Sequence, residues 1–305
     1  MEETKAFDPQ RFIWETLPLH PQPQPLESCT SYILRLAEAN GMKSTSELAT
    51  IAGASTGFQF ERRNPDYPHR RQVGLVRSAG CVLSTIQKTT FFHLSQHFGY
   101  GAFSPSFQRF LQGSLAPSLR YCPSCLAERA LPYYSLIWRF SSVPGCIQHH
   151  CALLDHCGHC SSPLPHLPLP PQIARCPTCQ GDLRACRTTP LSHKVLPSAR
   201  IRTRDLEMLL SPPKFQVDGS QARVIGKRFA ELRQHKGLST TEMATLMERE
   251  EAVIWDIEHV SPNKKATFGD YLHYADQLGY SLREIFDKNR LQAFLALPCE
   301  YLFLA

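Results

Sequence analysis

The amino-acid sequence predicts a mainly α-helical protein with small zinc-ribbon β elements near the middle of the chain. Apolar residues recur at helical spacing towards both ends of the 305 residues, whereas cysteines crowd the middle and proline-rich stretches separate these parts. The pattern divides the chain into an extended N-terminal tail over 1–26, a helical domain over 27–118, a tandem zinc-ribbon region over 119–187, a linker with a short helix over 188–221, and a helical bundle over 222–305.

Composition indicates an ordinary globular protein. Apolar residues make up 42% of the chain, which is enough for hydrophobic cores. No apolar run is long enough for a transmembrane helix, and the start MEETKAFDPQ has no signal-peptide core. We therefore expect a cytoplasmic protein whose twelve cysteines stay reduced instead of forming disulfides.

The charge is only mildly basic, at +6, which permits an acidic partner without demonstrating one. The excess lies in the first 200 residues, because 201–305 have a net charge of −1. A proline-containing loop there combines arginines with Tyr67, which suits phosphate or base contact as well as an ordinary solvated loop. The candidate nucleic-acid contacts are Arg62, Arg63, Arg70 and Arg71.

The N-terminal tail is predicted to be extended, because PLHPQPQPL holds four prolines and so lacks backbone donors. Its apolar run Phe12-Ile13-Trp14 either packs on the domain that follows or docks a partner. In that domain we expect a first helix ending at Asn40-Gly41 and a second starting with the capping-box spacing of Ser44 and Glu47. A second helical pair is expected over 78–112.

The cysteine cluster carries the strongest chemical signal. Three C-x-x-C pairs and one C-x-x-H pair occur in series, and a two-residue gap lets both side chains of a pair reach one metal ion. Intervening lengths of 20 and 15 residues suit zinc ribbons and sequential pairing. The predicted ligands of two structural zinc ions are Cys122, Cys125, Cys146 and His149, and then Cys157, Cys160, Cys176 and Cys179.

Nearby side chains leave alternatives open. His150 is the most credible substitute for His149, whereas Cys151 is expected to be a buried thiol; His156 and His159 also lie close. Each C-x-x-C or C-x-x-H pair forms a tight turn, called a knuckle below. Four knuckles in series are explained less well by a redox pair or an iron–sulfur cluster than by zinc.

The sequence has no enzyme motif in a structural context that would support catalysis. Gly53 to Gly57 match G-x-S-x-G around Ser55, but a nucleophile elbow follows a strand, and a helical pattern precedes this one. No zinc-deaminase or P-loop signature is present. We expect no enzymatic activity, and we expect Ser55→Ala to be without effect.

The C-terminal segment resembles a Cro/repressor-type helix-turn-helix domain over about 65 residues. Ser239 and Glu242 have capping-box spacing at the start of its second helix. The third helix, which such domains use for recognition, is marked by Val253, Ile254 and Ile257.

This resemblance departs at Glu248 and Arg249, where the family usually has glycine and a small apolar residue. The third helix also carries acids that we expect to face and repel phosphates: Glu250, Glu251, Asp256 and Glu258. A protein-docking or dimerising role is therefore favoured over reading of the major groove.

Taken together, residues 25–160 resemble the TniQ family. The matching residues are Pro25 to Ser28, Ser31 to Ile33, Arg35 to Gly41, Arg120 to Glu128, Trp138-Arg139, Cys146, His149, Leu153-Leu154, and Cys157 with Cys160. The family usually has tryptophan at the position of Tyr32, and a proline where this chain has Ile147.

The resemblance implies a non-catalytic target selector of Tn7-like transposons. Such proteins link target recognition to the AAA+ regulator TnsC and the transposase, combine helix-turn-helix elements with zinc ribbons, and in some members dimerise. We expect an adaptor recruited by a CRISPR effector complex. A TnsD-like direct DNA binder and a zinc-containing transcription regulator remain as alternatives.

Overall fold

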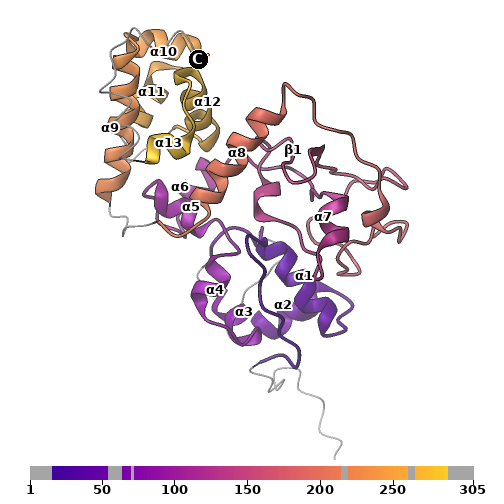
Figure 1. The fold of residues 1–305 in the computed structure, drawn as a ribbon. Coiled ribbons are helices and arrows are strands. Elements are labelled where there is room, and N and C mark those ends of the chain that lie inside the picture. The colour runs from indigo at the N-terminus through magenta and orange to yellow at the C-terminus, as the bar shows by residue number, and fades with distance from the viewer. Residues whose placement is uncertain (1–15, 54–63, 70–71, 214–218, 260–264, 288–305) are drawn as a thin grey trace, which may run out of the picture. The chain divides into compact units, whose positions relative to one another are not determined.

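The computed structural model describes residues 16–53, 64–69, 72–213, 219–259 and 265–287. Helices dominate this part of the chain, and its strands are short (Figure 1). Two compact units are distinguished: one comprises 1–91, 118–136 and 154–188, and the other 92–117, 137–153 and 189–305. The second unit contains the antiparallel pair β1 (Gly145–Cys146) and β2 (Cys151–Ala152).

The first unit is built on α1 (Cys29–Ala39), which begins where Ser28 caps it by accepting a hydrogen bond from the N–H of Ser31. Helix α2 (Thr45–Gly53) follows, and the Ser44 hydroxyl accepts from the N–H of Glu47 at 3.4 Å, as the sequence pattern predicts. Apolar side chains of α1 and α2 share one core with Leu17 and with residues of α3 (Val73–Ser78) and α4 (Leu83–Gln87).

A buried ion pair fixes the start of α1. Glu27 is fully buried and Arg35 is 7% exposed, and their carboxylate and guanidinium groups meet at 2.6 and 2.8 Å. The Glu27 carboxylate also accepts from the Ser31 hydroxyl and from the N–H of Gln24. All four of its contacts are therefore local, and they join the segment before α1 to the helix itself.

The expected helical pair over 78–112 is wrong. The chain instead forms α3, α4, α5 (Phe92–His97) and α6 (Pro105–Phe110), each of five or six residues. Gly80 follows α3 and Gly99 follows α5 with left-handed backbone angles, which end those two helices. Of the apolar residues in this segment, Val82 is 65% exposed, whereas Ile86, Phe91 and Leu94 are buried.

The second unit has an aromatic core. Phe98 lies at its centre, with ring centroids 4.9 to 5.9 Å from the other rings of this core: Phe110, Phe268, Tyr271 and Phe286. Edge-on and tilted arrangements of this kind suit the ring quadrupoles. Residues far apart in the chain are thereby joined.

The segment 188–221 contains a longer helix than expected. The sequence predicts a helix over Arg200–Leu210, and the structure has α8 over Leu196–Leu209, with Pro197 in its first turn. Helix α8 packs against β1, α5 and α13 (Leu282–Phe286) and buries Leu206 and Leu209.

The C-terminal helices are α9 (Gly219–His235), α10 (Thr240–Leu246), α11 (Glu251–His259), α12 (Phe268–Leu278) and α13. Capping boxes start α10, α12 and α13, and the one at Ser239 and Glu242 was predicted from the sequence. Helices α9 and α11 approach closely at Gly226, where a Cβ atom would lie 2.4 Å from the Glu258 carbonyl oxygen.

Tyr32 places a polar hydroxyl group in the apolar core of the first unit. Its side chain is fully buried, burial raises its pKa, and its hydroxyl has no hydrogen-bond partner among the described residues. We expect Tyr32→Phe to raise the free energy of unfolding by about 1 kcal/mol, because it removes an unsatisfied buried group and keeps the ring. Urea denaturation measures this change.

Tyr134→Phe is the matched control. The Tyr134 hydroxyl is also buried, but it accepts the N–H of Ala174 at 3.1 Å. Its removal should lower stability by about 1–3 kcal/mol. Equal effects of the two substitutions would contradict the assignment of Tyr32.

Candidate metal centres

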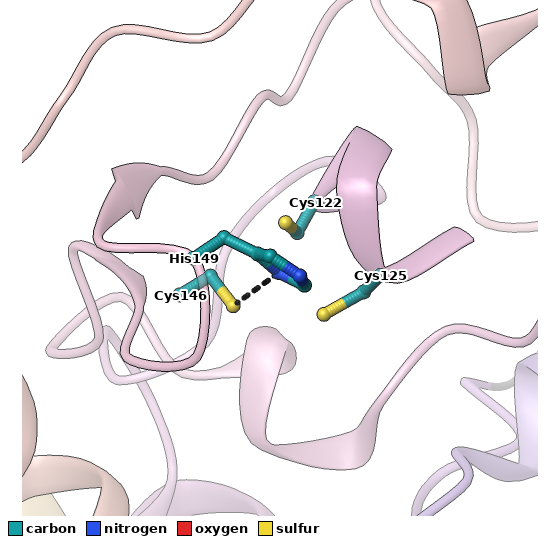
Figure 2. Close-up of side chains that lie close together, drawn as sticks. All are labelled: Cys122, Cys125, Cys146 and His149. Carbon is teal, nitrogen blue, oxygen red and sulfur yellow. Dashed lines mark hydrogen bonds between the residues drawn. The ribbon is translucent and has the colours of Figure 1, made fainter. Parts of the chain in front are cut away.

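The first candidate metal centre brings together Cys122, Cys125, Cys146 and His149, whose ligand atoms all lie within 4.8 Å of one another (Figure 2). Cys122 is the N-cap of α7 (Pro123–Glu128), and Cys125 stands in its first turn. Cys146 ends β1, and His149 follows in the turn before β2. The three cysteines are buried.

The spacing of these atoms matches tetrahedral zinc. The distance from the Cys146 sulfur to Nδ1 of His149 is 3.5 Å. Zinc bonds of about 2.3 Å to sulfur and about 2.0–2.1 Å to nitrogen place those two atoms about 3.5 Å apart at a tetrahedral angle. Three soft thiolates and one imidazole are also a donor set that zinc prefers.

The second candidate metal centre consists of Cys157, Cys160, Cys176 and Cys179, also within 4.8 Å of one another. Sulfur atoms from opposite knuckles are 3.7 Å apart in the pairs 157/179 and 160/176. Tetrahedral zinc–thiolate geometry requires about 3.8 Å. Both groups therefore follow the sequential pairing inferred from spacing, and each is consistent with a zinc ion.

Backbone and hydroxyl donors support the second centre. The N–H of His159 points at the Cys157 sulfur at 3.4 Å. Hydrogen bonds from Ser162 lower the pKa of the Cys160 thiol to about 6, which favours the thiolate that a metal needs. The Asp182 carboxylate binds Arg184, and this contact lowers the pKa of Asp182 to about 2. The backbone carbonyl of Asp182 contacts Nε2 of His159 at 2.8 Å.

The neighbouring alternatives stand apart from both centres. His150, the substitute considered for His149, has its Nε2 3.4 Å from the guanidinium of Arg200. Cys151 is the cross-strand partner of Cys146 and is buried. His156 contacts Asp155 at 2.8 Å. None of them belongs to either group of four.

Left-handed residues follow three of the four knuckles, a feature that spacing alone did not reveal. His150, Ser161 and Gln180 have φ angles of 51°, 59° and 59°. In two of these knuckles the left-handed residue donates its N–H to the carbonyl of the first cysteine, at 2.8 Å from Ser161 and 2.9 Å from Gln180. The backbone thus closes a tight turn around each pair of ligands at a conformational cost.

Relieving that strain should stabilise the second centre. We expect Gln180→Gly to raise the free energy of unfolding of the metal-loaded protein by about 0.5–1 kcal/mol, because glycine adopts φ near 59° without a Cβ penalty. Thermal unfolding at saturating zinc measures the change. Gln180→Ala keeps the Cβ atom and should give no gain; an equal gain from alanine would show that the angle is not the cause.

Other candidate residues lie outside the described residues. Arg62, Arg63, Arg70 and Arg71 belong to this group, as do Ser55 and the apolar run Phe12-Ile13-Trp14. Cys186 stands outside both predicted sets of ligands and is a buried thiol whose sulfur would lie 2.9 Å from a Cβ atom on Gly158, inside a knuckle. Glycine at position 158 therefore leaves the space that this thiol fills.

The fold is mainly helical, and two groups of four side chains in the middle of the chain could each hold a metal ion. Residues 18–153 match the model of the TniQ family. That family comprises non-catalytic accessory proteins of Tn7-like transposition that act in target selection. The resemblance inferred over 25–160 is thereby confirmed through residue 153, which includes the first centre and stops short of the second.

A search of curated proteins found no match to the chain. Among the residues that the structure describes, no helix combines the length and apolarity needed to cross a membrane.

Proposed function

We propose that the protein is a non-catalytic adaptor in target selection for Tn7-like transposition. It links a target-recognition complex, which we take to be a CRISPR effector complex, to the AAA+ regulator TnsC and through it to the transposase. It meets target DNA as part of this assembly. The TniQ match over 18–153 supports the role.

We further propose that α10 and α11 form the helix-turn-helix, and that two structural zinc ions are held by the eight residues grouped above. The capped α10 and its packing against α11 support the first assignment. The zinc ions would supply structure and no reaction step, because four protein ligands close each tetrahedral site.

The exposed face of α11 is the observation that carries the adaptor role. Helix α11 contains no lysine or arginine, although cations are what phosphates require. Trp255 is instead 51% exposed and stacks on His259, with ring centroids 4.7 Å apart. A large exposed aromatic residue suits a protein interface.

The structure corrects the expectation that all four of these acids face a ligand. Of the four acids on the third helix, Asp256 and Glu258 are buried and do not face a ligand. The Glu258 carboxylate binds Arg233 at 2.7 and 2.9 Å, and Asp256 accepts the N–H of Lys265 at 2.5 Å. Repulsion of phosphates therefore rests on Glu250 and Glu251 alone, so the lack of cations on α11 carries more weight than its acids do.

Trp255→Ala in the full-length chain tests this proposal. We expect the variant to lose capture of a protein component, TnsC or the effector complex, by at least tenfold and to lose targeted insertion with it. Its affinity for DNA should stay unchanged. Val224→Ala, which shortens an apolar side chain of similar exposure on α9, should leave both intact.

The alternatives give different results. A TnsD-like direct reader should lose sequence-specific DNA affinity in Trp255→Ala and should bind one attachment sequence without partners. A zinc-containing transcription regulator should be dispensable for insertion. Either result would overturn the adaptor proposal.

A further inference from the structure

Basic side chains gather where α8 begins, next to the turn that carries His149. Helix α8 packs against β1, and the two elements lie side by side in Figure 1. Four exposed basic residues stand at this place, and we call them the basic face: His150, His193, Lys194 and Arg200. No role assigned so far to the metal centres or to α11 uses this face.

Backbone and side-chain contacts hold the basic face together. The N–H of Leu191 donates to the carbonyl of His150 at 2.8 Å, and the guanidinium of Arg200 lies 3.4 Å from Nε2 of His150. His193 and Lys194 stand in the short turn between these two contacts. The chain is therefore anchored on both sides of Lys194, and segments distant in the sequence meet at one face.

The second unit has no acidic residue in the parts of its sequence that build this face. Aspartate and glutamate are absent from 92–117, 137–153 and 189–204, and the first acid of the unit is Asp205, which is buried. On α8 the first exposed acid is Glu207, seven residues and about 10.5 Å along the helix from Arg200. Basic and neutral side chains are therefore what these segments offer.

The two permanent cations of the basic face are not neutralised by the protein. Among the residues that the structure describes, neither the ammonium of Lys194 nor the guanidinium of Arg200 has a carboxylate within 4.0 Å. Asp155, which follows the same stretch of sequence, contacts His156 at 2.8 Å. Zinc in the first centre would leave one negative charge on its three thiolates, but these cysteines are buried. The face thus presents positive charge to solvent.

The start of α8 adds positive potential to the basic face. The helix has 14 residues, no acid in its first turn and no capping side chain at Val195, so the positive end of its dipole is not offset there. The contact with Arg200 adds a donor as well. A guanidinium can only donate, which makes Nε2 of His150 the acceptor and places the proton of the neutral ring on Nδ1.

We propose that the basic face binds the phosphate backbone of duplex DNA. Lys194 and Arg200 contact phosphate oxygens, and the imidazole N–H groups of His150 and His193 donate to neighbouring phosphates. Cations, polar side chains and helix N-termini supply most phosphate contacts in protein–DNA complexes. No base edge is read, so the contact is independent of sequence.

The composition of the basic face favours nucleic acid over a protein partner. Protein interfaces depend on aromatic or other anchor residues that fill pockets. The structure describes every residue of 137–153 and 189–200, and no large hydrophobic residue of these segments is exposed. Helix α11 differs, because Trp255 is exposed there. A polar surface with unneutralised cations matches evenly charged phosphates.

The inference rests on the proposed role in target selection, and it gives target DNA a place on this chain. An adaptor delivered by another complex has no need to read sequence, but phosphate contacts raise its affinity for DNA. The face is remote in sequence from Arg62, Arg63, Arg70 and Arg71, and it lies on other elements than Trp255. Substitutions can therefore separate DNA binding from capture of a protein.

The test compares two double variants of the full-length chain. Lys194→Ala with Arg200→Ala removes both permanent cations of the basic face. Arg109→Ala with Arg223→Ala removes the same charge from exposed positions on α6 and α9. Affinity for a labelled 30-base-pair duplex of mixed sequence is measured over a salt series. Thermal melting and zinc analysis check the fold of each variant.

We expect the basic-face variant to lose about 0.9 per contact from the slope of log affinity against log salt, or about 1.8 for two contacts. Its affinity at low salt should fall at least tenfold, while the control variant stays within twofold of the parent. Arg200→Lys keeps the charge and should retain most of the slope. Capture of TnsC or of the effector complex should be the same in all variants.

An equal loss of slope in the basic-face and control variants would overturn the DNA site. So would a loss of binding to duplex RNA or to polyglutamate with DNA binding retained, because the face would then serve another ligand. Targeted insertion that requires the chain, while both variants bind DNA alike, would overturn the DNA site and leave the adaptor role standing. Insertion that proceeds without the chain would overturn the adaptor role, and the salt slopes would still decide the DNA site.

Discussion

Cys125→Ser and Cys160→Ser should each yield a protein that misfolds and does not merely lose part of its activity. Each substitution removes one of four ligands from a closed site, and structural zinc contributes on the order of 10 kcal/mol of apparent binding free energy. That is comparable to the whole stability of a typical domain, about 5–15 kcal/mol. Circular dichroism and zinc analysis of the purified chains measure the outcome.

Cys151→Ser provides the control for the first centre. Cys151 is buried and lies directly across from Cys146, yet it is outside the group of four ligands. The variant should keep about two zinc ions per chain and its secondary structure. Fewer than one zinc per folded parent chain, or equal damage from the control, would refute the assignment of the ligands.

Glu27→Gln should have the second largest effect, a loss of about 3–5 kcal/mol in the free energy of unfolding. The substitution leaves the Arg35 guanidinium, only 7% exposed, without its carboxylate. A buried charge that has lost its partner retains its desolvation cost with no compensating attraction. Urea denaturation with zinc held constant gives the value.

Arg184→Met serves as the contrasting case. Arg184 also binds a carboxylate, that of Asp182, at 2.8 Å, but these two side chains are 44% and 34% exposed. Exposed pairs contribute at most about 1 kcal/mol. If both substitutions cost the same, burial would not be what makes the Glu27–Arg35 pair matter.

Sequence patterns that involve only a few neighbouring residues predicted local structure correctly. The capping residues Ser44 and Ser239 start helices where predicted, because a cap depends on residues three apart. The predictions that failed concern features that depend on contacts between residues distant in the sequence. Apolar spacing over 78–112 suggested long helices, but left-handed glycines at positions 80 and 99 divide the segment, and packing determines which apolar residues are buried.

The candidate metal centres were predictable for the same reason. A C-x-x-C spacing brings two ligands together within one turn, so only the pairing of knuckles had to be inferred. The choice between His149 and His150 was not predictable, since it depends on the left-handed backbone of His150 and the position of Arg200. Burial of Asp256 and Glu258 likewise depends on partners distant in sequence, as Arg233 shows for Glu258.

The unequal burial of the two centres has a kinetic consequence. Cys122, Cys125 and Cys146 are shielded from water, whereas Cys179 of the second centre is exposed. A chelator or an alkylating reagent must reach a sulfur atom before a metal ion can leave, so exchange at the second centre should be faster. Under metal limitation the protein would then lose its ions in a fixed order, and the part matching the TniQ family would keep its ion longest.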